Sequence, residues 1–172
     1  MLDENNKFNL PALKEKVDEL LAKQDNLLYL LNTPAHNPTG YSLSGEDMDG
    51  VLAILKEAAV PGKNIVFFLD VAYIDYAGEK EEVRKIFKKL SGLPANILCI
   101  VGYSMSKGFT MYGQRTGAMI GVSSDKSVID EFAAIKPIHQ PCNLVQHQPS
   151  GYAHSGNHLQ QSRAAGEGLR RA

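Results

Sequence analysis

The chain has few cysteines, no long apolar run and almost no net charge. Its two cysteines, Cys99 and Cys142, have neither the number nor the spacing of a disulfide framework or a metal site, so we expect a reducing, cytoplasmic environment. A formal charge of -1 gives no electrostatic reason to expect nucleic acid or an anionic membrane as a partner. No apolar stretch approaches the roughly 20 residues that span a bilayer, and residues 1–9 lack the apolar region of a signal peptide, so we expect neither membrane insertion nor export.

The length and the hydrophobic content of the chain suit one globular domain. A chain of 172 residues with 44% hydrophobic content can bury a single ordinary core. Asn9 and Pro11 are typical of a helix start, and the apolar residues that follow share one face, which predicts a helix over residues 11–24. The short apolar run 27–31 then predicts a buried strand.

The alternation of helices and strands continues along the chain. Ser44 and Asp47 resemble a capping box at the start of a second helix, and residues 65–69 are continuously apolar, as expected of a strand covered on both faces. A third helix is marked by Val83, Ile86, Phe87 and Leu90, and further strands are expected at 97–101 and 118–122. This alternation predicts an α/β fold with a largely parallel sheet, whose ligands bind outside the carboxyl ends of the strands.

Three post-strand loops carry the polar residues of interest. They are His-Asn-Pro-Thr-Gly at 36–40, Asp-x-x-Tyr at 70–73, and Ser-x-Ser-Lys at 104–107 with Arg115 eight residues after the lysine. Each alone has an ordinary structural interpretation: a proline turn, a helix cap or surface acid, or a solvated loop lysine. Their occurrence together, in order, at the ends of successive strands indicates a binding site.

In these motifs the sequence resembles the fold-type-I pyridoxal-phosphate enzymes, and among them the class I/II aminotransferases of the aspartate and aromatic kind. The resemblance covers about residues 8–135 and implies part of a three-layer large domain. It implies pyridoxal 5'-phosphate as cofactor, an amino acid and a 2-oxo acid as substrates, and the homodimer that is usual in the family. Which amino acid is the substrate does not follow from these residues.

The resemblance also implies a role for each motif residue. Lys107 would be the amine that condenses with the cofactor aldehyde and moves protons, and Asp70 would keep the ring nitrogen protonated. Asn37 and Tyr73 would donate hydrogen bonds to the cofactor's phenolic oxygen. The phosphate would be held by Ser104, Ser106 and Arg115, with backbone room supplied by Gly108 and Gly117.

The segment after residue 135 has a different composition. Four of the five histidines lie there, without hydrophobic periodicity and without zinc-site spacing, so we expect a disordered polar tail and no metal site. Codons permitted for residues 136–172 can be read in a shifted frame as an aminotransferase-like string. We therefore interpret 1–135 as a partial cofactor-binding domain and 136–172 as a non-homologous frameshift product.

Two other functional interpretations stay open at this point. A complete member of the family is more than twice as long, so the chain is expected to be a truncated, inactive fragment or a relic that binds cofactor weakly. Ser104 and Lys107 also satisfy the S-x-x-K pattern of certain serine hydrolases, but the S-D-N and K-T-G elements of that class do not occur in the sequence.

Overall fold

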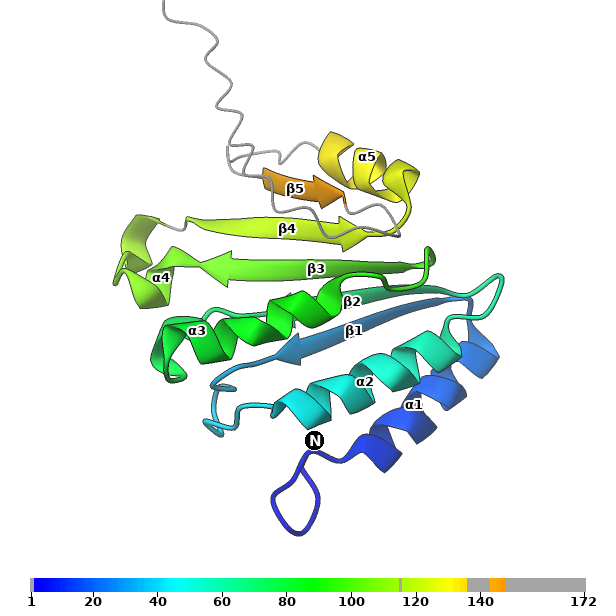
Figure 1. Cartoon of the computed structure of the whole chain (residues 1–172), viewed down its shortest axis with the longest axis horizontal. Helices are drawn as coiled ribbons and strands as arrows, with labels where there is room; N and C mark the ends of the chain where they lie inside the picture. The colour runs from blue at the N-terminus through cyan, green and yellow to red at the C-terminus, as the bar shows by residue number, and fades with distance from the viewer. Residues whose placement is uncertain (1, 115, 136–142, 148–172) are drawn as a thin grey trace, which may run out of the picture.

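The computed structural model describes residues 2–114, 116–135 and, for the backbone alone, 143–147. Helices and strands alternate around a single five-stranded sheet of order β1-β2-β3-β4-β5 (Figure 1). The strands are β1 (Asn26–Asn32), β2 (Asn64–Asp70), β3 (Ile97–Ser104), β4 (Gly117–Ser123) and β5 (Asn143–His147). The helices are α1 (Leu10–Lys23), α2 (Gly45–Ala58), α3 (Lys80–Val83), α4 (Met105–Gly108) and α5 (Lys126–Ala134), with 3₁₀ turns η1 (Ile74–Tyr76), η2 (Arg84–Leu90) and η3 (Tyr112–Gln114).

The first two helices begin where the sequence predicts. The Asn9 side chain accepts a hydrogen bond from the Ala12 amide at the start of α1. Ser44 and Asp47 form a reciprocal capping box at the start of α2, each side chain accepting from the other residue's amide. Both caps satisfy amides that the first helical turn leaves without a partner.

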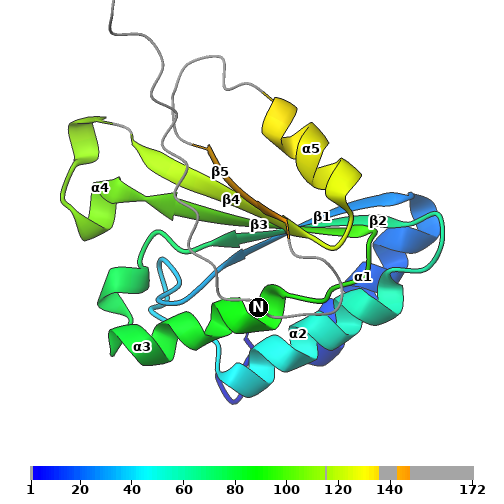
Figure 2. The ribbon, with the colours of Figure 1, turned by 45° about the horizontal axis from the view of Figure 1, so that its top comes forward.

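The sheet is largely parallel, as predicted. β1, β2 and β3 run parallel, β3 and β4 pair antiparallel, and β4 and β5 run parallel. The connections from β1 to β2 and from β2 to β3 cross over in the same direction along the sheet. Because such crossovers are right-handed, their helices lie on the same face. Figure 2 shows α1, α2 and α3 together on that face, with α5 on the other.

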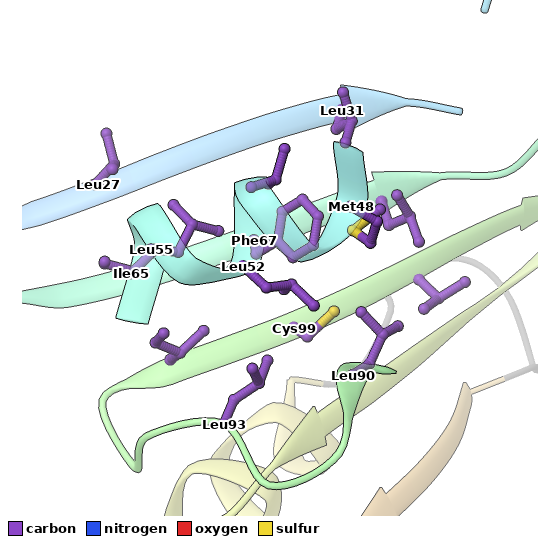
Figure 3. Close-up of a cluster of buried hydrophobic side chains, with 14 of the residues drawn as sticks. Leu27, Leu31, Met48, Leu52, Leu55, Ile65, Phe67, Leu90, Leu93 and Cys99 are labelled. Atoms are coloured by element: carbon purple, nitrogen blue, oxygen red, sulfur yellow. The ribbon is translucent and has the colours of Figure 1, made fainter. Parts of the chain in front are cut away.

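The core lies between this helical layer and the sheet. Figure 3 shows side chains of α2 and of β1–β3 meeting there, with Phe67 near the centre and Cys99 between Leu52 and Leu90. The largest fully buried side chains include Phe67, Met48, Leu55 and Ile65. The core-facing residues of β2 and β3 alternate with half-exposed ones, as the period of a strand requires.

Two sequence predictions differ from the structure. The strand at 65–69 was expected to be covered on both faces, but only its core face is buried, and in β1 Leu28 and Leu30 are 66% and 59% exposed. The reason is that the crossovers place the helices on one side. The third helix is mostly a 3₁₀ segment, although Val83, Ile86 and Leu90 keep the spacing of an α-helix.

The segment predicted to be a disordered tail contains β5, which pairs with β4. The rest of that segment, residues 136–142 and 148–172, lies outside the described part of the structure.

Candidate functional site

Three loops that are distant in sequence meet at one edge of the sheet. They follow the carboxyl ends of the parallel strands β1, β2 and β3, which end side by side in Figure 1. The strand register pairs Asn32 with Asp70, and Asp70 with Gly102. Side chains from the three loops therefore converge at the edge where ligands bind in sheets of this kind.

The loop after β1 is tied to β2 by polar contacts. The Asn32 side chain donates to the Asp70 carbonyl (3.2 Å) and accepts from the Asn37 amide (2.8 Å). Thr33, fully buried, donates its amide to the same Asp70 carbonyl (3.0 Å), and its hydroxyl accepts from the Leu43 amide (3.1 Å). The peptide bonds before Pro34 and Pro38 are cis. These contacts fix Asn37 beside the end of β2.

Asn37, Tyr73 and Lys107, one from each loop, come together. The Asn37 side-chain amide donates to the Tyr73 hydroxyl (3.2 Å), and the Lys107 ammonium lies 5.5 Å from the centre of the Tyr73 ring. The same ammonium lies 4.8 Å from the centre of the Tyr112 ring. A lysine held over two aromatic faces is positioned by attraction between its charge and the rings.

Asp70 is the last residue of β2 and is half-buried. Its side chain leaves the sheet on the face opposite the buried Leu69, and its Oδ1 accepts from the Ala72 amide (3.0 Å). The carboxylate is thereby held at the strand end where the loop carrying Tyr73 begins.

The loop after β3 carries the two predicted serines and the lysine. Ser104 ends β3 and caps α4 by accepting from the Ser106 amide (3.2 Å), and Ser106 is buried. The Lys107 carbonyl accepts from the Tyr76 hydroxyl (2.6 Å), while the Lys107 side chain is half-buried. Arg115, the predicted phosphate ligand, lies outside the described residues.

A second polar cluster, centred on Asp75, lies against α4. Asp75 accepts from the Tyr103 hydroxyl (2.8 Å) through Oδ2 and from the Arg84 guanidinium (3.1 Å) through Oδ1. Burial, followed by the hydrogen bond to Asp75, raises the pKa of Tyr103 above its ordinary value. A Cβ at Gly108 would lie 2.2 Å from Asp75 Oδ2, so the backbone of α4 passes directly over this carboxylate.

Sequence reasoning missed the supporting residues Asn32, Asp75, Tyr76 and Tyr112. Tyr76 and Tyr112 lie three and five residues after motif residues, and that proximity is the one signal that the sequence offered. Gly108 and Gly117 were expected to supply backbone room. Both have close neighbours, since a Cβ at Gly117 would meet the Tyr103 carbonyl at 2.4 Å.

His36 forms a local hydrogen bond rather than joining the cluster. Its Nδ1 lies 2.8 Å from the Thr39 hydroxyl within the same loop. Across the described residues, no group of three or more histidine, cysteine or acidic side chains is arranged to hold a metal ion. Within the same residues, no helix combines the length and apolar character needed to cross a membrane.

The fold and this edge define an α/β protein in which side chains from three loops, Lys107 among them, converge at the carboxyl ends of parallel strands. The model of the family described as aminotransferase class I and II matches residues 2–162. The chain belongs to this family, and the match extends into the segment after residue 135 that the sequence suggested to be non-homologous.

Individual relatives agree with the family match. The chain is 33% identical over 116 residues to an aromatic-amino-acid aminotransferase of Escherichia coli, covering 64% of this chain and 27% of the relative. It is 31% identical over 131 residues to an aspartate aminotransferase of Pseudomonas aeruginosa, covering 76% and 30%. A crystal structure of an aminotransferase from Anaerococcus prevotii superposes with a TM-score of 0.74 at 44% identity, covering 77% of this chain and 33% of that one. The chain thus spans about a third or less of each.

Proposed function

We propose that this chain forms part of the cofactor site of a pyridoxal-phosphate-dependent aminotransferase, with Lys107 as the residue that holds the cofactor covalently. The observation that supports this most strongly is the meeting of Lys107, Tyr73 and Asn37 from three separate loops. The donor set suits the cofactor, because it combines a primary amine, a carboxylate, a phenol and hydroxyl groups at one edge of the sheet.

The remaining residues have distinct tasks in this proposal. Pyridoxal phosphate, when bound, supplies an electron sink for the charge that develops at the substrate Cα. Asp70 keeps a proton on the ring nitrogen by placing a negative charge beside it. Tyr73 and Asn37 donate hydrogen bonds to the phenolic oxygen, and the Lys107 amine moves a proton at the substrate Cα.

The phosphate is assigned to Ser104, Ser106 and Arg115. In α4 the Ser104 oxygen accepts from the Ser106 amide, which leaves the Ser104 hydroxyl hydrogen available to donate. A guanidinium can grip two phosphate oxygens at once, which is the reason for assigning Arg115 to the same group.

The test is covalent labelling of lysines. Purified chain is mixed with pyridoxal phosphate, its visible absorption is recorded, and the adduct is reduced with borohydride and mapped by peptide mass. We expect a specific absorption band and selective labelling of Lys107, with both lost in Lys107→Ala and retained in Lys88→Ala, an exposed lysine that serves as control. Equal labelling of Lys88 and Lys107 would refute the assignment.

The chain covers only a small share of its relatives' length, which favours a second candidate function. In this candidate the chain binds the cofactor weakly and catalyses no reaction. Since the chain spans 27% to 33% of the three relatives above, much of such an active site lies outside the matched part. Adding an amino acid to the cofactor-loaded chain separates the two candidates. Conversion to the pyridoxamine form supports a competent half-site, whereas an unchanged spectrum supports binding alone.

The substrate class in this proposal is an amino acid with a 2-oxo acid as amino acceptor. The relatives named above are an aromatic-amino-acid and an aspartate aminotransferase, so both kinds of side chain are candidates. A cytoplasmic location is part of the same proposal, and a matching relative from Dictyostelium discoideum is named a cytoplasmic aspartate aminotransferase.

A further inference from the structure

The short turn η1 follows Tyr73 directly and lies against α4, the helical turn that carries Lys107. Its first residue, Ile74, is buried in the hydrophobic core and fixes the turn to the sheet. Its other two residues, Asp75 and Tyr76, both form hydrogen bonds with groups in α4 or near its start. The turn therefore connects the core to the segment that holds the lysine.

The Asp75 carboxylate joins η1 to two other segments. Its Oδ2 accepts a hydrogen bond from the Tyr103 hydroxyl of β3 (2.8 Å), and its Oδ1 accepts one from the Arg84 guanidinium of η2 (3.1 Å). The side chains of Asp75 and Arg84 are 30% and 34% exposed, so water and salt screen their attraction less than that of a fully exposed pair. Each carboxylate oxygen has a partner in a different segment, which fixes the orientation of the carboxylate.

The backbone of α4 lies directly on this carboxylate at Gly108. A Cβ at that position would overlap Asp75 Oδ2 and would lie 3.0 Å from the Tyr103 hydroxyl oxygen. A side chain there would have to displace one of the two bonded groups, whereas glycine accepts the close approach. Because Gly108 comes directly after Lys107, this bonded pair determines how closely the lysine main chain approaches η1.

Two further contacts connect the same loop to Lys107 itself. The Tyr76 hydroxyl donates to the Lys107 carbonyl (2.6 Å), and the Lys107 ammonium lies 5.5 Å from the centre of the Tyr73 ring. Tyr73 and Tyr76 lie within two residues of Asp75 in the sequence. A shift of Asp75 and of η1 therefore disturbs the contacts of both the main chain and the ammonium of the lysine.

We infer that Asp75 is a positioning residue, which together with Tyr103 and Arg84 holds α4 and thereby sets the place of the Lys107 amine. Asp75 acts on the lysine through Gly108 and through the neighbouring tyrosines. An amine reacts efficiently with a bound aldehyde only when it is held close to the reacting geometry. The effect on α4 concerns conformation alone, whereas its consequence for cofactor binding rests on the proposed function.

The first experiment measures amide hydrogen exchange in the full chain. The Phe109 and Thr110 amides donate to carbonyls of α4, so their exchange reports opening of this turn. We expect both amides to exchange about tenfold faster in Asp75→Asn, because asparagine has one side-chain acceptor oxygen and cannot satisfy both donors. Exchange in α1 and α2 is expected to remain that of the wild type.

Tyr103→Phe is the milder companion variant, since it removes the hydroxyl and leaves the ion pair of Asp75 with Arg84 in place. We expect the same local rise in exchange. Combining both substitutions should give no faster exchange than the faster single variant, because the two remove one shared interaction. Asp49→Asn is the matched control. It also removes a carboxylate that accepts from a cation, Lys89 (2.6 Å), and it is expected to leave exchange in α4 unchanged.

The second experiment compares two aldehydes, each followed by borohydride reduction and peptide mapping. Formaldehyde labels any accessible amine, whereas rapid labelling by pyridoxal phosphate needs an amine placed within the proposed cofactor site. We expect Asp75→Asn to slow the labelling of Lys107 by pyridoxal phosphate about tenfold and to leave its labelling by formaldehyde unchanged, because reactivity falls steeply when the amine is misplaced. Lys88, which is exposed, is the internal reference for both reagents.

Two outcomes of the exchange experiment overturn the inference. One is unchanged exchange at Phe109 and Thr110 in both single variants. The other is an equal rise in exchange throughout the chain, since Asp75 would then only stabilise the fold. Circular dichroism and urea unfolding show whether each variant folds. If Asp75→Asn does not fold, Tyr103→Phe decides the question by the same criteria.

The labelling experiment separates this inference from the proposed function. A local rise in exchange without selective labelling of wild-type Lys107 supports the positioning role and refutes the proposed cofactor site. Selective labelling of Lys107 that is equally fast in the wild type and in Asp75→Asn overturns the positioning role and leaves the proposed function intact.

Discussion

At the scale of single residues, the loop carrying Lys107 is restrained from two sides. Tyr76 donates to the Lys107 carbonyl, and the Tyr73 and Tyr112 rings lie beneath its ammonium. Contacts between an ammonium and an aromatic ring contribute about 0.5–1 kcal/mol at exposed sites. The main chain and the side chain of Lys107 are thus positioned by different partners.

Gly108 allows α4 to approach Asp75, and replacing it should disturb this arrangement. We expect Gly108→Ala to lower the free energy of unfolding by about 1–3 kcal/mol, because the new methyl group would push the Asp75 carboxylate away from Tyr103 and Arg84. Gly113→Ala in the following turn is the control, since a Cβ there meets nothing within 4 Å. Urea unfolding measures both, and equal stability of the two variants would contradict the steric argument.

The protonation of Tyr29 makes the stability of the fold depend on pH in the alkaline range. Burial raises its pKa from 10.0 to about 12, so between these values the folded chain keeps a proton that the unfolded chain has lost. Its contribution to stability is therefore complete below pH 10 and lost as the pH rises towards 12. Burial also raises the pKa of Cys99 to about 12, which adds a decline in the same direction.

The test is Tyr29→Phe, which removes the titrating hydroxyl and keeps the ring that stacks on Phe67 at 5.7 Å. We expect the urea midpoint of the variant to fall less steeply than that of the wild type between about pH 10 and about pH 11. Parallel declines would show that Tyr29 does not titrate in this way.

At the scale of secondary-structure elements, the stability of α2 depends on the hydrogen bonds at its first turn. The Asp47 carboxylate accepts from the Ser44 amide and from the Tyr41 hydroxyl (2.9 Å). Burial alone would raise the pKa of Asp47, but the hydrogen bonds from Ser44 and Tyr41 outweigh it, and the pKa is lowered. The cap thus joins the loop after β1 to the helix that follows.

Removing the cap hydroxyl should weaken this helix measurably. We expect Ser44→Ala to destabilise the chain by about 1 kcal/mol and Ser44→Gly by only a few tenths, because glycine tolerates the cap conformation and leaves the Asp47 amide open to water. Thermal unfolding gives both values. A loss as large for glycine as for alanine would contradict the cap as the cause.

At the scale of the whole molecule, one face of the sheet has a continuous helical cover and the other has α5 alone among the described residues (Figure 2). The family match covers residues 2–162, and the chain spans about a third or less of the relatives named above. The activity of the chain by itself therefore needs a direct test.

We expect the chain alone to show no transamination, even where Lys107 is labelled by the cofactor. In the proposed function the three described loops supply groups for the cofactor, and no described residue is assigned to the substrate carboxylate. The measurement is 2-oxo acid formation from an aromatic amino acid or aspartate, with Lys107→Ala as the background. Turnover above that background would contradict the expectation.

The origin of residues 136–172 has a direct test in the coding DNA. We propose that the adjacent reading frame from codon 136 encodes an aminotransferase-like string. Sequencing that region decides the point, since absence of such a string from the shifted frame removes the frameshift hypothesis.

The order of the elements and the identity of the motif loops could be predicted from local sequence patterns. Caps such as Asn9 and Ser44 act within a few residues, and the apolar periods of α1 and β1 report local backbone geometry, so both could be predicted. The 3₁₀ form of η2 could not, because the spacing of its apolar residues is that of an α-helix.

The contacts between distant residues could not be predicted from local patterns. Asn37 and Tyr73 are 36 positions apart, and the contacts of Asp75 with Tyr103 and Arg84 join β3 to two different segments. The exposure of Leu28 and Leu30 depends on the face to which the crossovers direct the helices. Local patterns specify helices and strands because the interactions involved are short in sequence. The polar cluster at the strand ends and the exposed face of β1 depend on contacts between distant segments, which no short stretch of sequence contains.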